Sequence, residues 1–149
     1  MTTIILLGIL GAVITAVVGT LWYSDTTPMG KLQLRALGFD RLTPDERAAR
    51  IAAAKPRMVK QYFGQFALAF LTACAASFIV IMSMQNGVPF SMALCFVVVN
   101  WLCFMVPIIG QNILWGNVDR SLAWKKFFSE ISSNLVTLLI IAYIAHFFA

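Results

Sequence analysis

Apolar residues in this chain come in four long blocks, separated by shorter segments that hold nearly all of the charges. The blocks cover residues 4–23, 61–84, 88–113 and 127–148, and the only acid in any of them is Glu130. A helix needs about 20 residues, rising 1.5 Å each, to cross roughly 30 Å of hydrocarbon. Each block meets that length. The pattern therefore predicts an all-α integral membrane bundle of four transmembrane helices.

The composition of the chain is unlike that of a soluble domain. Hydrophobic residues make up 60% of it and charged residues 11%, whereas about 25% of a typical soluble domain is charged. A secretion signal is the rival interpretation of the first block, but no Lys or Arg precedes that block and three further blocks follow it. We therefore expect a single membrane domain over residues 1–149.

Lysine and arginine are confined to alternate connecting segments. Eight of the eleven lie between the first and second blocks, three lie between the third and fourth, and the segment between the second and third has none. Because basic loops remain in the cytoplasm, both termini and residues 85–91 are expected outside it. The basic residues are therefore interpreted as topological anchors that also attract anionic lipid headgroups, and not as a nucleic-acid surface.

The first connecting segment, residues 24–60, is the one part of the chain with soluble character. Residues 31–38 mix leucine with basic residues and end in Gly38, which is typical of a short interfacial helix. Thr43 and Glu46 then match a Thr-x-x-Glu capping box, which predicts the start of a second helix. Pro56 disfavours the α conformation of the residue before it, so a break or kink is expected there. We therefore expect short amphipathic cytoplasmic helices between the first two spans.

Three short motifs after the first block resemble those of a known family. They are Leu21-Trp22-Tyr23-Ser24, Pro28-Met29-Gly30-Lys31 and Arg35-Ala36-Leu37-Gly38-Phe39, with Pro107, Asn112 and Gly116 later in the chain. The pattern is similar to that of the domain-of-unknown-function 1761 family of small bacterial polytopic membrane proteins. The resemblance implies a protein of the bacterial inner membrane with no established activity. Its signature residues here are Trp22, Tyr23, Ser24, Gly30 and Lys31.

Polar residues inside the spans are the best candidates for a functional site, because an unsatisfied polar group in hydrocarbon is costly. The fourth span carries four of them on one helical face, namely Glu130, Ser133, Asn134 and Thr137. The third span adds Asn100, Gln111 and Asn112. Since consecutive antiparallel spans joined by a short loop are neighbours, we expect a polar intramembrane site between spans three and four. Glu130 is expected to bond to Gln111 or Asn112.

Two interpretations of Glu130 remain open. A partly desolvated carboxyl group could exchange protons or bind a cation. Alternatively, the side chain lies four residues after Lys126 and could form an ion pair with it, close to the membrane interface. The helix N-terminus nearby also favours an anion.

Small residues recur at helical spacing in the first two spans, as they do where helices pack closely in membranes. In the first span they are Gly8, Gly11, Thr15 and Gly19, and in the second they are Ala69, Thr72, Ala73, Ala76 and Ser77. We interpret both stripes as helix-packing surfaces. The sequence leaves open whether they meet each other or another subunit.

Motifs for catalysis or metal binding do not occur in the sequence. The three cysteines lie within spans without Cys-x-x-Cys spacing, and His146 is the only histidine. No P-loop, nucleophile elbow or zinc-protease helix is found. We therefore expect no enzyme activity, no metal and no cofactor.

Two functional hypotheses follow from these observations. In the first, the chain is a small transporter or permeation protein that uses the polar site. In the second, it is an accessory or scaffold subunit of a larger membrane complex. Either role implies a partner in the bilayer, as a homo-oligomer or in association with another membrane protein, because four helices enclose little volume.

The charge pattern makes a testable prediction about topology. A reporter that works only outside the cytoplasm should be active when fused after Ala149, and a reporter that works only in the cytoplasm should be inactive there. Fusion of the same two reporters within residues 24–60 should give the opposite result. Cytoplasmic activity after Ala149 would rule out the expected orientation.

Overall fold

The computed structural model describes residues 1–114 and 120–149, with the side chains of residues 112–114 excluded. Its described residues form helices and no strands. The elements are α1 (Thr2–Trp22), α2 (Pro28–Ala36), η1 (Phe39–Arg41), α3 (Pro44–Gln85), α4 (Phe90–Asn100), η2 (Trp101–Met105), α5 (Val106–Leu114) and α6 (Arg120–His146).

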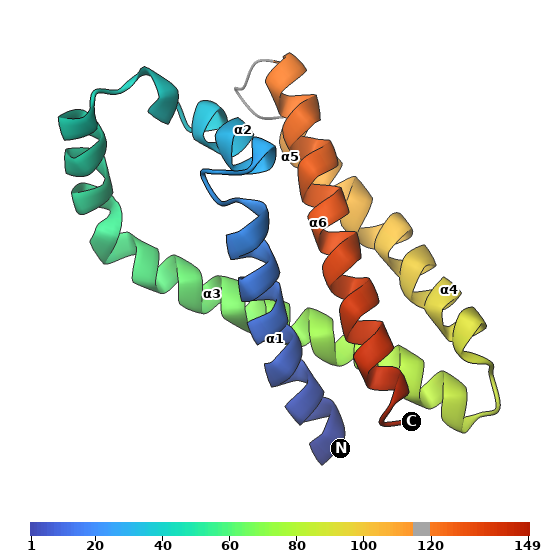
Figure 1. Ribbon diagram of the computed structural model, residues 1–149. Coiled ribbons are helices and arrows are strands. Elements are labelled where there is room, and N and C mark those ends of the chain that lie inside the picture. The colour runs from blue at the N-terminus through green and yellow to red at the C-terminus, as the bar shows by residue number, and fades with distance from the viewer. Residues whose placement is uncertain (115–119) are drawn as a thin grey trace.

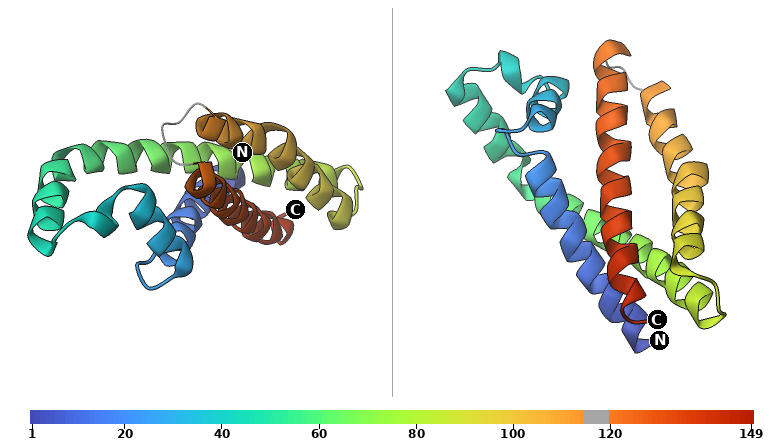
Figure 2. Two further views of the ribbon diagram at one scale, coloured as in Figure 1. Left: turned by 90° about the horizontal axis from the view of Figure 1, so that it is seen from above. Right: turned by 45° about the vertical axis from the view of Figure 1, so that its right-hand side comes forward.

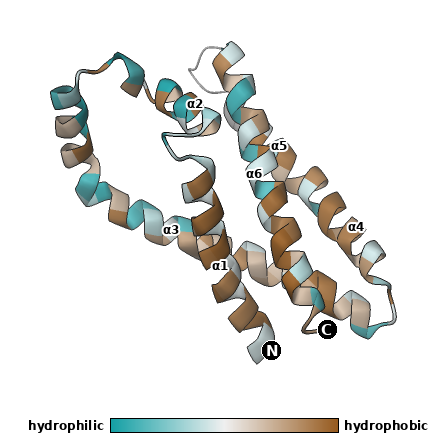
Figure 3. Cartoon of the chain, viewed as in Figure 1, coloured by the Kyte–Doolittle hydropathy of each residue, from teal (hydrophilic) through white to brown (hydrophobic). Residues whose placement is uncertain are grey.

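Four helices are long and apolar enough to cross a membrane. They are α1, α3, the continuous helix formed by α4, η2 and α5 as far as Gln111, and α6. The expected all-α bundle of four transmembrane helices is confirmed, and the chain is a membrane protein. Hydrophilic residues gather on α2, the start of α3 and the start of α6, at one end of the bundle (Figure 3).

The helices alternate in direction, as four successive spans must. Both termini lie at one end of the bundle, together with the turn between α3 and α4, whereas α2 and the start of α6 lie at the other end (Figures 1 and 2). The helices α1 and α6 run roughly alongside one another, and α3 crosses them at a steep angle (Figure 1). This tilt of α3 separates the helices at the α2 end.

Helix α6 is the centre of the bundle, and it contacts all five other α-helices. Its Leu138, Ile141, Ala142 and Ala145 belong to the buried core, to which α3 adds alanine, valine and isoleucine side chains, α1 adds Leu7 and α4 adds Val97. Many large apolar side chains elsewhere point outward, among them those of Leu10, Leu68 and Phe104. An apolar exterior is what a lipid environment favours, so this surface needs no further covering.

The closest packing in the bundle is the crossing of α1 and α3. A Cβ atom built on Gly8 would collide with Cys74 Sγ, and one built on Gly11 would collide with the Cβ of Ala73. The two small-residue stripes therefore meet each other at this point. Gly19, further along the first stripe, has no atom within 4 Å of such a Cβ. Of the three glycines in the stripe, the two nearer the N-terminus are therefore in the packed part.

The polar connection between α1 and α3 contains the two helices that the sequence predicts, but α2 begins at Pro28, three residues earlier than expected. Thr27 Oγ1 caps α2 by accepting from the Gly30 N–H at 2.9 Å. Gly38 follows α2 with a φ of 71°, a left-handed conformation that glycine adopts without strain. At the start of α3, the backbone N–H of Thr43 donates to Glu46 Oε2 at 2.8 Å, and the predicted capping box is confirmed.

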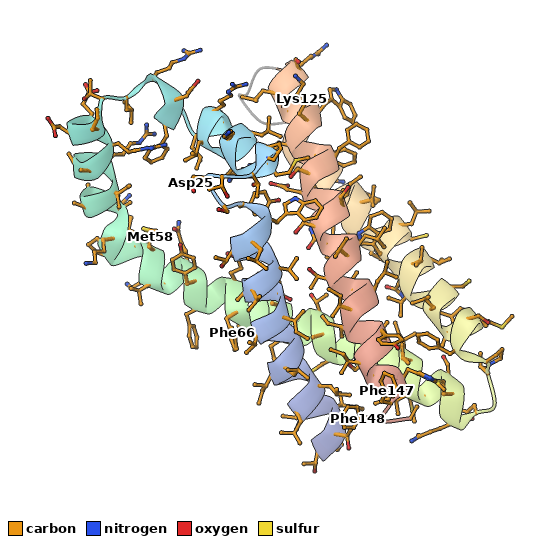
Figure 4. The ribbon with its side chains drawn as sticks, in the orientation of Figure 1. Asp25, Met58, Phe66, Lys125, Phe147 and Phe148 are labelled. Carbon is orange, nitrogen blue, oxygen red and sulfur yellow. The ribbon has the colours of Figure 1, made fainter. Side chains whose placement is uncertain are left out.

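Pro56 bends α3 without ending it. The helix continues from Pro44 to Gln85, and it turns sharply near Met58, two residues after the proline (Figures 1 and 4). The sequence predicts either a break or a kink at this position, and the structure has a kink. Proline removes one backbone donor and its ring displaces the preceding turn, which accounts for the bend. Residues 44–57, which we call the α3 arm, project away from the bundle (Figure 1).

The third span is interrupted by a π-helical turn. Residues 101–105 have this wider winding, directly before Val106 and Pro107. Pro107 has no N–H to donate to the carbonyl of Cys103, four residues earlier. A local change in winding is one way in which a helix accommodates that loss, and such turns recur at functional positions.

The α1–α3 crossing predicts opposite effects for two Gly→Ala substitutions in one helix. Gly11→Ala should destabilise the protein by about 1–3 kcal/mol, because the new methyl group overlaps Ala73. Gly19→Ala, the matched control, should not destabilise it, because open space surrounds that position and alanine is the better helix former. Thermal unfolding of the purified variants in detergent would measure both. Equal Tm values for the two variants would contradict the packing described.

The capping box predicts a local dependence on pH. Hydrogen bonds from the backbone N–H and hydroxyl of Thr43 lower the pKa of Glu46 below its ordinary value. A lowered carboxyl pKa stabilises the folded form above that ordinary value, and the contribution is lost as the pH falls through the lowered pKa. The first turn of α3 should therefore fray only below about pH 4.5.

Amide hydrogen exchange of the α3 arm in the wild type and in Glu46→Gln, compared at each pH, would measure this fraying. The comparison cancels the intrinsic pH dependence of exchange. The protection that Glu46 adds should vanish at acid pH, so that the two proteins converge. A constant difference from neutral to acid pH would argue against the carboxylate cap.

Candidate functional site

The polar face of α6 lines a cleft of about 840 Å³ at the α2 end of the bundle. The cleft lies between α6, α1 and α3, and Gln33 of α2 contributes to its wall. We call it the α1–α3–α6 cleft. Its polar lining consists of Thr15, Thr20, Tyr23, Gln33, Gln65, Glu130, Ser133, Asn134 and Thr137.

The cleft exists because α1 and α3 diverge. The two helices touch at Gly11 and Ala73, and from there α3 leans away toward its bend (Figure 1). Small residues of α1, Ala12, Ala16 and Gly19, form one wall and leave room for a bound molecule. The opposite wall carries the aromatic side chains of Tyr62 and Phe66 from α3; Figure 4 labels Phe66.

Donor groups along the cleft are largely satisfied by their own helices. The Thr15 hydroxyl donates to the Gly11 carbonyl at 2.8 Å, and the Thr137 hydroxyl donates to the Ser133 carbonyl at 2.9 Å. Asn134 Nδ2 donates to the Glu130 carbonyl at 2.9 Å. Each of these groups keeps an oxygen that can accept a further bond. Such acceptors suit a ligand that carries donors.

Among the described residues, Glu130 is the one charged residue in the lining of this cleft. Its carboxylate lies 3.4 Å from Lys126 Nζ, and about a third of each side chain is exposed, 32% and 35% respectively. The ion pair expected from the i, i+4 spacing is therefore present. Lys126 does not line the cleft, so the cleft itself has one acidic group and no basic one. No basic side chain among the described lining residues would pair with a bound anion.

The residues after α1 form a tight turn that holds α2 against α6. Trp22 Nε1 donates to Ser129 Oγ at 3.1 Å, and the Thr27 hydroxyl lies within hydrogen-bonding distance of the carbonyls of Trp22 and Ser24. A Cβ on Gly30 would collide with the carbonyl of Ser24, so only glycine fits there. Trp22, Ser24 and Gly30 of the sequence signature thus shape the turn.

Two of the signature residues lie elsewhere. Tyr23 lines the cleft, and Lys31 is exposed on α2. The sequence had not indicated Ser129, which is 3% exposed and anchors Trp22. Its position one helical turn before Ser133, on the polar face predicted for the fourth span, is the signal in the sequence that points to it.

The seven polar residues expected at one site fall into separate places. Glu130, Ser133, Asn134 and Thr137 share the cleft, as their common face predicts. Asn100 instead lies in a second groove, between α3, α4 and η2, and Gln111 is exposed on α5. The Asn112 side chain and residue Gly116 lie outside the described residues.

The expected position of the polar site between spans three and four is therefore corrected. The α6 face opens toward α1 and α3, while Gly110 of α5 approaches α6 at Phe127, where a Cβ would lie 3.7 Å from the ring. The reason is that α6 is surrounded by neighbours. The hairpin with the third span occupies only one part of its circumference.

The single histidine lies at the opposite end of the bundle. His146 Nδ1 is 3.2 Å from Met84 Sδ, and its ring stacks on Phe90 with centroids 4.5 Å apart. This cluster ties the end of α6 to the α3–α4 turn. No group of three His, Cys, Asp or Glu side chains comes together among the described residues in a way that would hold a metal ion.

Comparison of the chain with protein families, with curated proteins and with solved structures found no match. The fold and the cleft therefore have to be interpreted from their own chemistry. They define a four-span membrane protein with a cleft that is polar, aromatic and acidic.

Proposed function

We propose that this chain is a small transporter or permeation protein that binds a small organic cation in the α1–α3–α6 cleft. The observation that supports the proposal is the lining of that cleft, in which the described residues include one carboxylate and no lysine or arginine. Ionisable groups inside a membrane bundle are costly and usually serve a ligand or ion pathway. The cleft volume of about 840 Å³ is in the range of small-molecule sites.

The walls offer two kinds of attraction to a cation. Glu130 supplies charge, and a bound cation would share its carboxylate with Lys126. Tyr23, Tyr62 and Phe66 supply aromatic faces, which attract cations within about 6 Å of a ring centroid. The oxygens of Ser133 and Asn134 accept hydrogen bonds from an ammonium or similar donor.

The proposed setting is the bacterial inner membrane, with both termini outside the cytoplasm. The basic residues of α2 and the α3 arm support this orientation, and they put the cleft in the cytoplasmic half of the bilayer. The motifs that resemble the domain-of-unknown-function 1761 family support a bacterial origin. Anionic headgroups would then hold α2 and the arm at the membrane surface.

The second candidate function is that of an accessory subunit, and the α3 arm favours it. The arm projects from the bundle, and almost all of its side chains are exposed. Two of its arginines, Arg47 and Arg50, lie over the Phe39 ring with distances of 5.7 and 5.1 Å to the centroid. These contacts fasten the arm to η1, so that it presents a defined basic surface to a partner.

Substitution of Glu130 tests the transport proposal. Proteoliposomes that contain the wild type should take up a fluorescent aromatic monocation when a membrane potential, negative inside, is imposed. Glu130→Gln should reduce the initial rate by about tenfold or more, because it removes the only charge in the cleft. Uptake would be measured as the increase in fluorescence inside the vesicles.

The matched control is Asp40→Asn, which removes one acid in η1, outside the cleft. It should transport the cation at the wild-type rate. If Glu130→Gln also transports at that rate, or if the wild type gives no more uptake than empty liposomes, the transport proposal is wrong. Stoichiometric co-purification with a larger complex would then favour the accessory role.

A further inference from the structure

Asn100 lies at the centre of the third span. It comes ten residues after Phe90 and eleven before Gln111, the ends of that membrane-crossing segment. Ten residues rising 1.5 Å each correspond to about 15 Å, which is half of the hydrocarbon thickness. The amide is therefore as far from water at either membrane surface as a residue of this span can be.

The Asn100 side chain is exposed on the outside of the bundle, and no hydrogen bond to another described residue is found for it. The adjacent Trp101 has a buried Nε1 that also has no acceptor among the described residues. An amide in hydrocarbon without a hydrogen-bond partner is strongly unfavourable relative to one in water. The exposed Asn100 amide therefore requires a partner that the described part of the chain does not supply, whereas Trp101 Nε1 is already enclosed by the atoms of the chain itself.

Asn100 and Trp101 lie in one groove of about 180 Å³. On the other side of this groove α3 presents Thr72, Ala75 and Ala76, which are small. Small side chains allow another helix to come close, and interhelical hydrogen bonds from asparagine then add to the packing. The groove is otherwise apolar and thus suits a helix that carries one polar group at mid-membrane depth.

We propose that this groove is the interface between two copies of the chain, which pair through Asn100. The chemistry of the groove specifies the occupant. It must be apolar, it must lie at the bilayer centre, and it must offer both a hydrogen-bond donor and an acceptor to Asn100. A carboxamide has both, and the third span of a second copy carries Asn100 at that depth.

Two-fold symmetry makes this pairing self-complementary. In a symmetric dimer the same patch appears on both copies, so the amide N–H of each Asn100 donates to the side-chain oxygen of the other. A lipid acyl chain has neither donor nor acceptor and leaves the amide unsatisfied. The dimer interface is separate from the α1–α3–α6 cleft, because the two have no lining residue in common.

Sedimentation equilibrium of the purified full chain in density-matched detergent micelles tests this interface. The wild type should show a reversible monomer–dimer equilibrium. Asn100→Leu, which has similar volume but no hydrogen-bonding group, should raise the dimer dissociation constant by about tenfold or more. Asn100→Gln retains a carboxamide and should dimerise more strongly than Asn100→Leu.

The matched control is Gln111→Leu. It removes a carboxamide from the membrane-surface end of the same span, where water satisfies it, and the dissociation constant should not change. Circular dichroism would verify that each variant retains its helical content. A wild type that remains monomeric at every micelle concentration, or an Asn100→Leu variant that dimerises as the wild type does, would overturn the proposal.

Discussion

The close crossing of α1 and α3 at Gly8 and Gly11 is the contact on which the rest of the arrangement depends. Inside a bilayer, apolar side chains gain little by leaving lipid for another helix, so association relies on close packing. Glycine provides it here, because Cys74 and Ala73 occupy the space that a side chain would need. The point of contact also determines where the two helices separate, and thereby where the α1–α3–α6 cleft opens.

Helix α6 both packs in the core and carries the polar residues of the cleft, because it lies at the centre of the bundle. It carries more polar residues than any other span, and it contacts all five other α-helices. Its buried Ser133 and Thr137 lie beside the cleft, and Thr137 satisfies its donor within the helix. A central helix can thus hold polar groups away from lipid. The Glu130 carboxylate on this helix lies at the cleft, where Lys126 pairs with it.

Much of the fold was predictable because the bilayer limits the possibilities. An apolar block of about 20 residues has to be a helix, since only a helix satisfies its own backbone there. The capping box of Thr43 and Glu46 and the bend after Pro56 follow from local backbone chemistry, which needs no tertiary information. The same is true of the common face of Glu130, Ser133, Asn134 and Thr137, which depends only on helical periodicity.

The sequence by itself thus determined the number of spans, the cap and the kink of α3, and which polar residues share a face of α6. Only the tertiary structure decided what that face meets, and it selected α1 and α3 in place of the third span. The tertiary structure also gives the glycines of α1 different surroundings. Gly11 packs against α3 at the crossing, whereas Gly19 lines the cleft. The physical reason is that helical periodicity determines only the direction in which a side chain points from its own helix axis. Which other helix lies in that direction depends on how all the helices cross.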